Sequence, residues 1–234
     1  MKPVLIAEND QLLAGAGWIT RVLDRRGLPY RLADATSGGL DGIAADELSG
    51  LIMLGGRAHA WQEDADPWLR RERVLTEQCV AADVPILECC LSGQVLARAL
   101  GGTVRAAEAG EYGWLDIAPT DEGARDPLFR LAATSDEVYI WHDDEFTVPP
   151  GAVHLSRSDQ TPVQAFRYGR AWGLQFHPEC DLPLYDSWHG TFPDACVQVG
   201  LDPRHMRDTA ARREREDDLF AVRLIDAFAS VVLT

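Results

Sequence analysis

The chain has 234 residues, of which 46% are hydrophobic and 25% charged, an ordinary composition for a globular protein with one sizeable core. Its 22 lysines and arginines stand against 37 aspartates and glutamates, which gives a formal net charge of −15 at pH 7. Such a surface repels the phosphates of DNA or RNA and the headgroups of an anionic membrane. The charge therefore argues against nucleic-acid and membrane partners.

The cysteines indicate a reducing compartment. They are odd in number and show no zinc-type spacing, at positions 79, 89, 90, 180 and 196. The first residues, MKPVLIAENDQ, turn polar too early for the apolar core of a secretory signal. No apolar run approaches the roughly 18–20 residues of a membrane helix. We therefore expect a cytoplasmic protein, and the sequence carries no signal for a metal or a cofactor.

Short apolar runs alternate with amphipathic stretches through the first hundred residues, which predicts a parallel sheet with helices on both faces. The expected strands are 4–7, 30–35, 50–54 and 84–87, and the expected helices are 18–27, 67–82 and 93–100. The helix 67–82 carries the clearest signals, because Asp66 precedes Pro67 as a predicted cap. Its expected buried face holds Leu69, Val74, Leu75 and Cys79.

The second half of the chain changes character. Residues 103–153 contain β-rich pieces at 112–117 and 138–141, and the segments 163–167 and 171–176 flank a turn that predicts a hairpin. Residues 204–228 predict a long charged helix, whose RREREDD run we interpret as a solvated face, with an interaction segment as the alternative. We expect a single α/β domain over 1–234, with 180–234 as a mainly helical C-terminal extension.

Three expected strand ends carry residues suited to chemistry. They are Gly55-Gly56, Cys89-Cys90 and His177-Pro178-Glu179. In an open parallel α/β sheet, active sites form at the carboxyl ends of strands, where loops lead into helices. These three segments therefore mark a candidate site.

Cys90 is the candidate nucleophile of that site. A thiol at a strand-to-helix turn lies near the positive end of the helix dipole, which favours the reactive thiolate. His177 is suited to act as its base, and Glu179 to orient the imidazole. Taken singly, each residue also fits ordinary packing, since most free cysteines are small buried hydrophobes and a histidine is often a hydrogen-bonded core or surface residue.

Several motifs in a fixed order make the pattern more specific. They are LGG at 54–56, DPWL at 66–69, PILECCLSGQ with LARALGG between 85 and 102, and WGLQFHPE at 172–179. With these motifs, the chain from about Val4 to Glu179 resembles the class I glutamine amidotransferases, above all stand-alone members similar to the amidotransferase domain of GMP synthase. The resemblance implies a three-layer, flavodoxin-like α/β fold, with a mostly parallel central sheet and a small antiparallel β region.

The resemblance also implies a role for each matching position. Cys90 would attack the side-chain amide of glutamine and form a γ-glutamyl thioester, with His177 moving the protons and Glu179 orienting it. Backbone N–H groups of Gly56 and Leu91 would form the oxyanion hole. Gly55 and Gln94 match positions that contact the substrate, and the segment 141–144 matches one that borders the pocket.

The sequence departs from the family pattern at the nucleophile turn, which normally reads Gly-x-Cys-x-Gly-x-Gln. Glu88 and Ser92 replace the two glycines. An unpaired carboxylate beside the thiol would raise the pKa of Cys90 and oppose thiolate formation. Because Arg57 also departs from the pattern, standing where the family usually has proline, we hypothesise that Glu88 pairs with it.

Vicinal Cys89 is an alternative nucleophile, although the spacing to Gln94 favours Cys90 and leaves Cys89 as a buried strand residue.

The residues and the resemblance together leave three candidate functions. The chain is expected to be a glutaminase that releases ammonia from glutamine or a related γ-glutamyl amide, with the ammonia acceptor on a separate synthetase or other partner protein. The alternatives are a hydrolase of another small amide or ester and a catalytically silent relative with a binding or regulatory role.

Overall fold

A mixed sheet runs through the centre of the computed structural model, which describes residues 1–132, 136–216 and 218–234. Within these residues the sheet has nine strands in the order β2-β1-β3-β4-β9-β8-β7-β5-β6. The parallel half comprises β1 (Val4–Glu8), β2 (Tyr30–Asp34), β3 (Gly50–Met53), β4 (Ile86–Cys89) and β9 (Ala171–Leu174). The antiparallel half comprises β5 (Val104–Pro119), β6 (Asp136–Phe146), β7 (Val153–Arg157) and β8 (Ala165–Tyr168).

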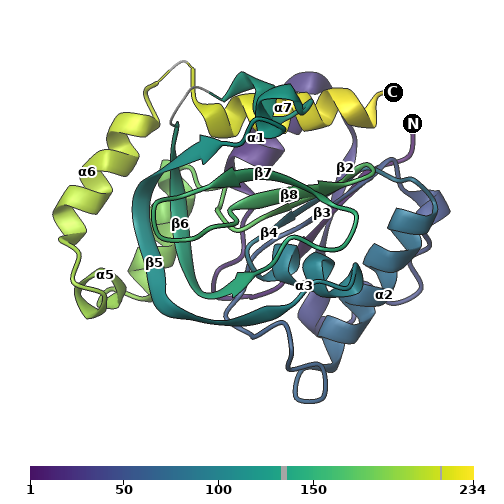
Figure 1. Cartoon of the computed structure of the whole chain (residues 1–234), viewed down its shortest axis with the longest axis horizontal. Coiled ribbons are helices and arrows are strands. Elements are labelled where there is room, and N and C mark those ends of the chain that lie inside the picture. Colours follow the sequence, from purple (N-terminus) through teal and green to yellow (C-terminus); the bar gives the residue numbers. More distant parts are fainter. Residues whose placement is uncertain (133–135, 217) are drawn as a thin grey trace.

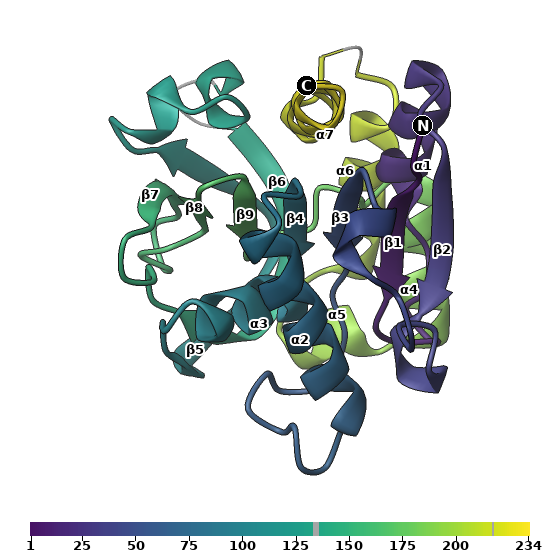
Figure 2. The same ribbon diagram turned by 90° about the vertical axis from the view of Figure 1, so that its right-hand side faces the viewer.

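Helices cover both faces of the parallel half (Figures 1 and 2). The longer helices are α1 (Gly17–Arg26), α2 (Pro67–Ala81), α3 (Leu91–Ala99), α4 (Leu182–Thr191), α6 (Pro203–Arg213) and α7 (Phe220–Val232), and α5 (Ala195–Gln198) is a single turn. Helices α1 and α7 pack together on one face, while α2 and α3 lie on the other (Figure 2). The predicted α/β fold with helices on both faces is confirmed.

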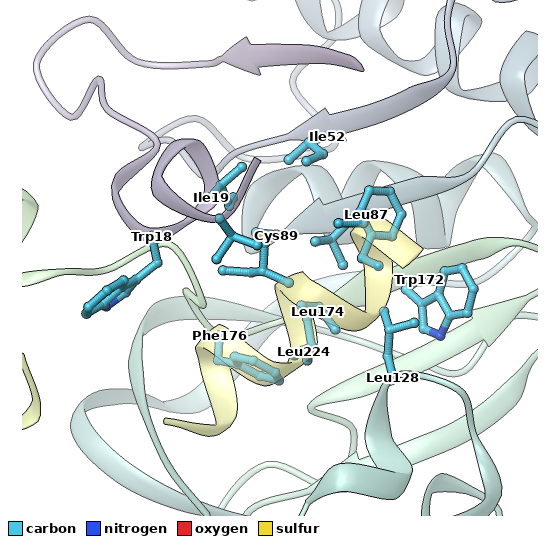
Figure 3. Packing of buried hydrophobic residues seen from close by; sticks show 14 of the residues in the cluster. Trp18, Ile19, Ile52, Leu87, Cys89, Leu128, Trp172, Leu174, Phe176 and Leu224 are labelled. Atoms are coloured by element: carbon cyan, nitrogen blue, oxygen red, sulfur yellow. The ribbon is translucent and has the colours of Figure 1, made fainter. Parts of the chain in front are cut away.

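Alternation along the parallel strands separates two hydrophobic clusters, one on each face of the sheet. In β1, Val4 and Ile6 point into the cluster beneath α1 and α7, whereas Leu5 and Ala7 point into the cluster beneath α2 and α3. Both sets are completely buried, because a strand covered on two faces has no solvent side. Figure 3 shows the first cluster, in which Cys89 of β4 packs with Leu174 and with Leu224 of α7.

The antiparallel half is larger than the small region expected, and it continues the same sheet. The predicted hairpin is confirmed, since β8 and β9 pair antiparallel on either side of Gly169. The β-rich pieces belong to two long strands, β5 and β6, whose pairing shifts register between Ala106 and Glu111. This ribbon carries residues 141–144 of β6 back toward the carboxyl ends of the parallel strands.

The structure corrects several local predictions. Strand β4 covers 86–89 rather than 84–87, and α3 covers 91–99 rather than 93–100. On α2, Leu69, Leu75 and Cys79 are buried as expected, but Val74 is 40% exposed because it points to the solvent side of the helix. Asp66 precedes α2 without a capping hydrogen bond from its side chain to any described residue.

The predicted long C-terminal helix is wrong, because two helices, α6 and α7, replace it. The charged run, which begins in the last turn of α6, is also not a purely solvated face. The Arg213 guanidinium is largely buried and bonds the backbone carbonyl of Glu137 on β6, and Arg212 pairs with the Glu137 side chain at 3.1 Å. Asp217 of this run lies outside the described residues. None of the helices in the described part of the chain is long and apolar enough to cross a bilayer.

Gly93 allows α3 to approach β9 closely, and this contact yields a prediction. A Cβ on Gly93 would lie 2.4 Å from the backbone oxygen of Leu174, and a rigid paired strand cannot yield easily. We expect Gly93→Ala to lower the free energy of unfolding by about 1–3 kcal/mol, the usual effect of overpacking. Gly190→Ala on α4 is the matched control, since no atom lies within 4 Å of its added methyl group. Denaturant unfolding of both variants tests the prediction, and equal stabilities would contradict it.

Candidate active site

Cys90 occupies a strained turn between β4 and α3. Its φ of 53° and ψ of −113° lie in a region that residues with a side chain rarely adopt. The turn is held by a hydrogen bond of 2.8 Å from the Cys90 N–H to the carbonyl of Leu174 on β9. This is the geometry of a nucleophile elbow, in which a sharp strand-to-helix turn presents one reactive side chain.

His177 and Glu179 follow β9 and face the elbow. The His177 Nδ1 lies 2.8 Å from Oε1 of Glu179, and both side chains are buried. Burial alone would lower the pKa of His177, but the charges of Glu179 and Cys90, and its hydrogen bonds to both, raise this pKa well above its usual value. The buried carboxylate of Glu179 therefore favours the protonated form of the imidazole beside the Cys90 sulfur.

The Gly55-Gly56 loop after β3 lies against Cys90 and His177. A Cβ on Gly55 would lie 2.7 Å from Cε1 of His177 and 3.2 Å from Cβ of Cys90. Only glycine therefore fits between the thiol and the imidazole. A Cβ added to Gly56 would lie 3.1 Å from the Asn9 carbonyl oxygen and 3.1 Å from Cδ2 of Leu91, so this position also favours glycine.

A cavity of about 500 Å³ opens above the elbow. All seven residues predicted as site residues line it: Gly55, Gly56, Cys90, Leu91, Gln94, His177 and Glu179. Gln94 is held in place, since its Nε2 donates to the backbone oxygen of Asp144 at 3.3 Å. Among the described residues, no group of three or more histidine, cysteine, aspartate or glutamate side chains is arranged to hold a metal ion.

Sequence reasoning missed two parts of the wall. His59 lines the cavity and its Nδ1 lies 2.6 Å from Oδ2 of Asp144 on β6. The opposite wall comes from the C-terminal helices and includes Trp188, His189 and Phe192. The ring of Trp188 lies 5.4 Å from that of His177, edge to face. No motif marks these aromatic residues, because only the packing of α4 against the strand ends brings them to the site.

The hypothesised pairing of Glu88 with Arg57 is wrong. Arg57 forms an ion pair with Asp10 at 2.6 Å, and its guanidinium lies over the ring of Phe192. Glu88 is completely buried on the other side of β4, where Oε1 lies 2.5 Å from the hydroxyl of Thr76 on α2. Alternation along β4 turns the Glu88 side chain away from the cavity. Cys89 is a buried strand residue, as predicted.

Comparison with known proteins agrees with this geometry. The family model for glutamine amidotransferase class-I matches residues 17–187. The chain belongs to the class-I glutamine amidotransferase family.

Relatives of the family extend the likeness over most of the chain. A component of the glutamine-hydrolyzing GMP synthase from Methanosarcina mazei is 33% identical over 143 residues, which are 60% of this chain and 69% of the relative. A glutamine amidotransferase from Thermotoga maritima superposes with a TM-score of 0.89 at 26% identity, over 100% of this chain and 99% of its own. A glutamine amidotransferase from Methylobacillus flagellatus gives 0.85 at 26% identity, over 98% and 95% of the two chains.

The contact between His177 and Glu179 predicts a measurable electrostatic effect. Because the carboxylate stabilises the protonated imidazole, Glu179→Gln should lower the pKa of His177. NMR titration of the His177 ring measures this change. Glu145→Gln is the control, since Glu145 pairs with Arg105 on the antiparallel ribbon. A His177 pKa that is the same in Glu179→Gln and in the wild type would contradict the prediction.

Proposed function

We propose that this amidotransferase hydrolyses the side-chain amide of glutamine through a thioester on Cys90. The observation that carries the proposal is the strained elbow of Cys90 set against the hydrogen-bonded pair of His177 and Glu179, at the floor of a cavity. A nucleophile, a proton carrier and an orienting carboxylate in contact are the parts that acyl transfer requires.

In this mechanism the Cys90 thiolate attacks the amide carbon, and the protonated His177 gives its proton to the nitrogen, which leaves as ammonia. A water molecule then gives a proton to His177 and its hydroxide adds to the thioester, so that glutamate leaves and the thiolate and the protonated imidazole are both restored. The raised pKa of His177 suits the first step, since the imidazole starts with the proton that the leaving nitrogen needs.

Backbone N–H groups of Gly56 and Leu91 are proposed to stabilise the oxyanion. Leu91 is the first residue of α3, and the first N–H groups of a helix have no acceptor within the helix. Fixed donors of this kind each lower an acyl-transfer barrier by roughly 3–4 kcal/mol. Gly55 and Gln94 are proposed to contact the substrate, since both line the cavity beside the nucleophile.

The ammonia acceptor is proposed to be a separate protein. The Methanosarcina mazei relative is named as one subunit of a glutamine-hydrolyzing GMP synthase. By analogy with that name, we propose that ammonia from this chain passes to a synthetase partner.

The cavity favours a second candidate substrate, a γ-glutamyl amide with a substituent on the amide nitrogen. Its volume of about 500 Å³ and its aromatic wall at Trp141, Trp188 and Phe192 leave space for such a group. The silent-relative alternative is weakened, because Glu88, the residue that suggested it, bonds Thr76 away from the thiol.

Ammonia release from glutamine tests the main proposal. Cys90→Ala should lose activity by about 10³-fold or more, as removal of a covalent nucleophile does. Cys89→Ala is the matched control and should retain activity, since its thiol packs in the core beneath α1 and α7. Ammonia release that survives in Cys90→Ala would remove this residue as nucleophile.

A comparison of substrates tests the second candidate. If the aromatic wall binds a substituent, wild-type enzyme should hydrolyse γ-glutamyl-p-nitroanilide with a lower KM than glutamine, and Phe192→Ala should raise that KM several-fold. Steady-state kinetics with both substrates measures the difference. An equal change in KM for glutamine would show that Phe192 does not select the substituent.

A further inference from the structure

Two carboxyl groups lie completely buried beneath the nucleophile elbow. Glu72 of α2 and Glu88 of β4 are each 0% exposed. Neither has a cationic neighbour within the described residues. Buried carboxylates without a cation are strongly disfavoured, so their presence at this position calls for a physical role.

A hydrogen-bonded network joins Glu72 to the two loops of the active site. The Asn9 amide nitrogen lies 2.9 Å from Oε2 of Glu72, 2.8 Å from Oγ of Ser92 and 3.0 Å from the Leu54 carbonyl. Ser92 also donates to the Leu54 carbonyl at 2.7 Å. Ser92 stands two residues after the nucleophile, and Leu54 directly precedes Gly55. The network therefore fixes the elbow to the glycine loop.

Glu88 joins the same region through α2. Its Oε1 bonds the Thr76 hydroxyl, and Thr76 stands one helical turn after Glu72. The second oxygen of each carboxyl, Oε1 of Glu72 and Oε2 of Glu88, has no hydrogen-bond partner among the residues that the structure describes. The region therefore offers too few donors for two ionised carboxylates.

Electrostatics agrees with this donor count. Burial raises the pKa of Glu72 to about 8, although the nearby Ser92 hydroxyl and the Asn9 amide lower it. Burial and the neighbouring Glu72 raise the pKa of Glu88 well above its usual value. Among the described residues, the titratable group that faces the pair from α2 is the thiol of Cys79, whose pKa burial and Glu88 raise to about 12. Cys89 lies on the opposite face of β4. The surroundings of the pair are thus uncharged at neutral pH.

We propose that Glu72 and Glu88 form a protonated carboxyl pair whose hydrogen bonds set the position of the nucleophile relative to the oxyanion donors. They are positioning residues, because they do not touch the substrate: Glu72 acts through Asn9, Ser92 and the Leu54 carbonyl, and Glu88 acts through Thr76 on the same helix as Glu72. When Glu72 ionises, its negative charge has no cationic partner in a low-dielectric interior, and the bridge between elbow and glycine loop loosens. The catalytic part of this inference rests on the glutaminase function proposed above.

The test compares Glu72→Gln, Glu88→Gln and Ser92→Ala, with Glu77→Gln as a control on the exposed side of α2, where it pairs with Arg73. Ser92→Ala breaks the bridge and should lower kcat about 10–100-fold with little change in KM, as expected for misplacement of catalytic groups. The wild-type kcat should fall as the pH rises through about 8, the pKa of Glu72. Glu72→Gln, which cannot ionise, should retain its kcat there.

Thermal unfolding separates this inference from the proposed function. The folded pair keeps protons that the unfolded chain releases near pH 4.5, so this term lowers wild-type stability as the pH rises from there toward 8. Glu72→Gln and Glu88→Gln should reduce the fall in Tm, whereas Glu77→Gln should follow the wild type.

If the wild type releases no ammonia, the proposed function fails, and the rate at which iodoacetamide alkylates Cys90 replaces kcat as the measure of elbow geometry. If Glu72→Gln and Glu88→Gln keep the wild-type pH dependence of Tm, the inference that the two carboxyl groups are protonated in the folded protein is overturned. A Ser92→Ala variant with unchanged kcat and unchanged alkylation would overturn its positioning role.

Discussion

The candidate active site depends on one hydrogen bond across the sheet, from the Cys90 N–H to the Leu174 carbonyl. It holds Cys90 in a left-handed backbone conformation that the residue would not keep in an isolated peptide. The parallel pairing of β4 with β9 supplies this acceptor, and the same strand β9 leads into His177. One pairing therefore both strains the elbow and places the His177 imidazole beside it.

Close packing around the elbow explains which residues are small. Gly93 allows α3 to pack against the Leu174 backbone, and Gly55 fits between the Cys90 thiol and the His177 imidazole. The positions of the two missing family glycines carry Glu88 and Ser92, which make hydrogen bonds instead. On the side of β4 that faces α2, hydrogen bonds from these two side chains therefore connect neighbouring elements at positions where glycine would allow close backbone packing.

Much of the site was predictable from residues at strand ends. The segments 55–56, 89–90 and 177–179 each follow an apolar strand, and the carboxyl ends of parallel strands meet at one edge of a sheet. The contacts of the Glu88 side chain were not predictable in this way. Period-two alternation separates its side chain from that of Cys89, but only the placement of α2 shows that Glu88 meets Thr76 and Glu72 rather than Arg57.

The sequence by itself determined the fold class, the family resemblance and the residues that line the candidate site, because apolar periodicity and ordered motifs are local properties of the chain. Only the tertiary structure decided the partners of the charged side chains and the aromatic wall from α4. Arg57 contacts Asp10, and Trp188 contacts His177, across separations that no local pattern encodes. These contacts are set by how helices pack on the sheet, which is a property of the whole core.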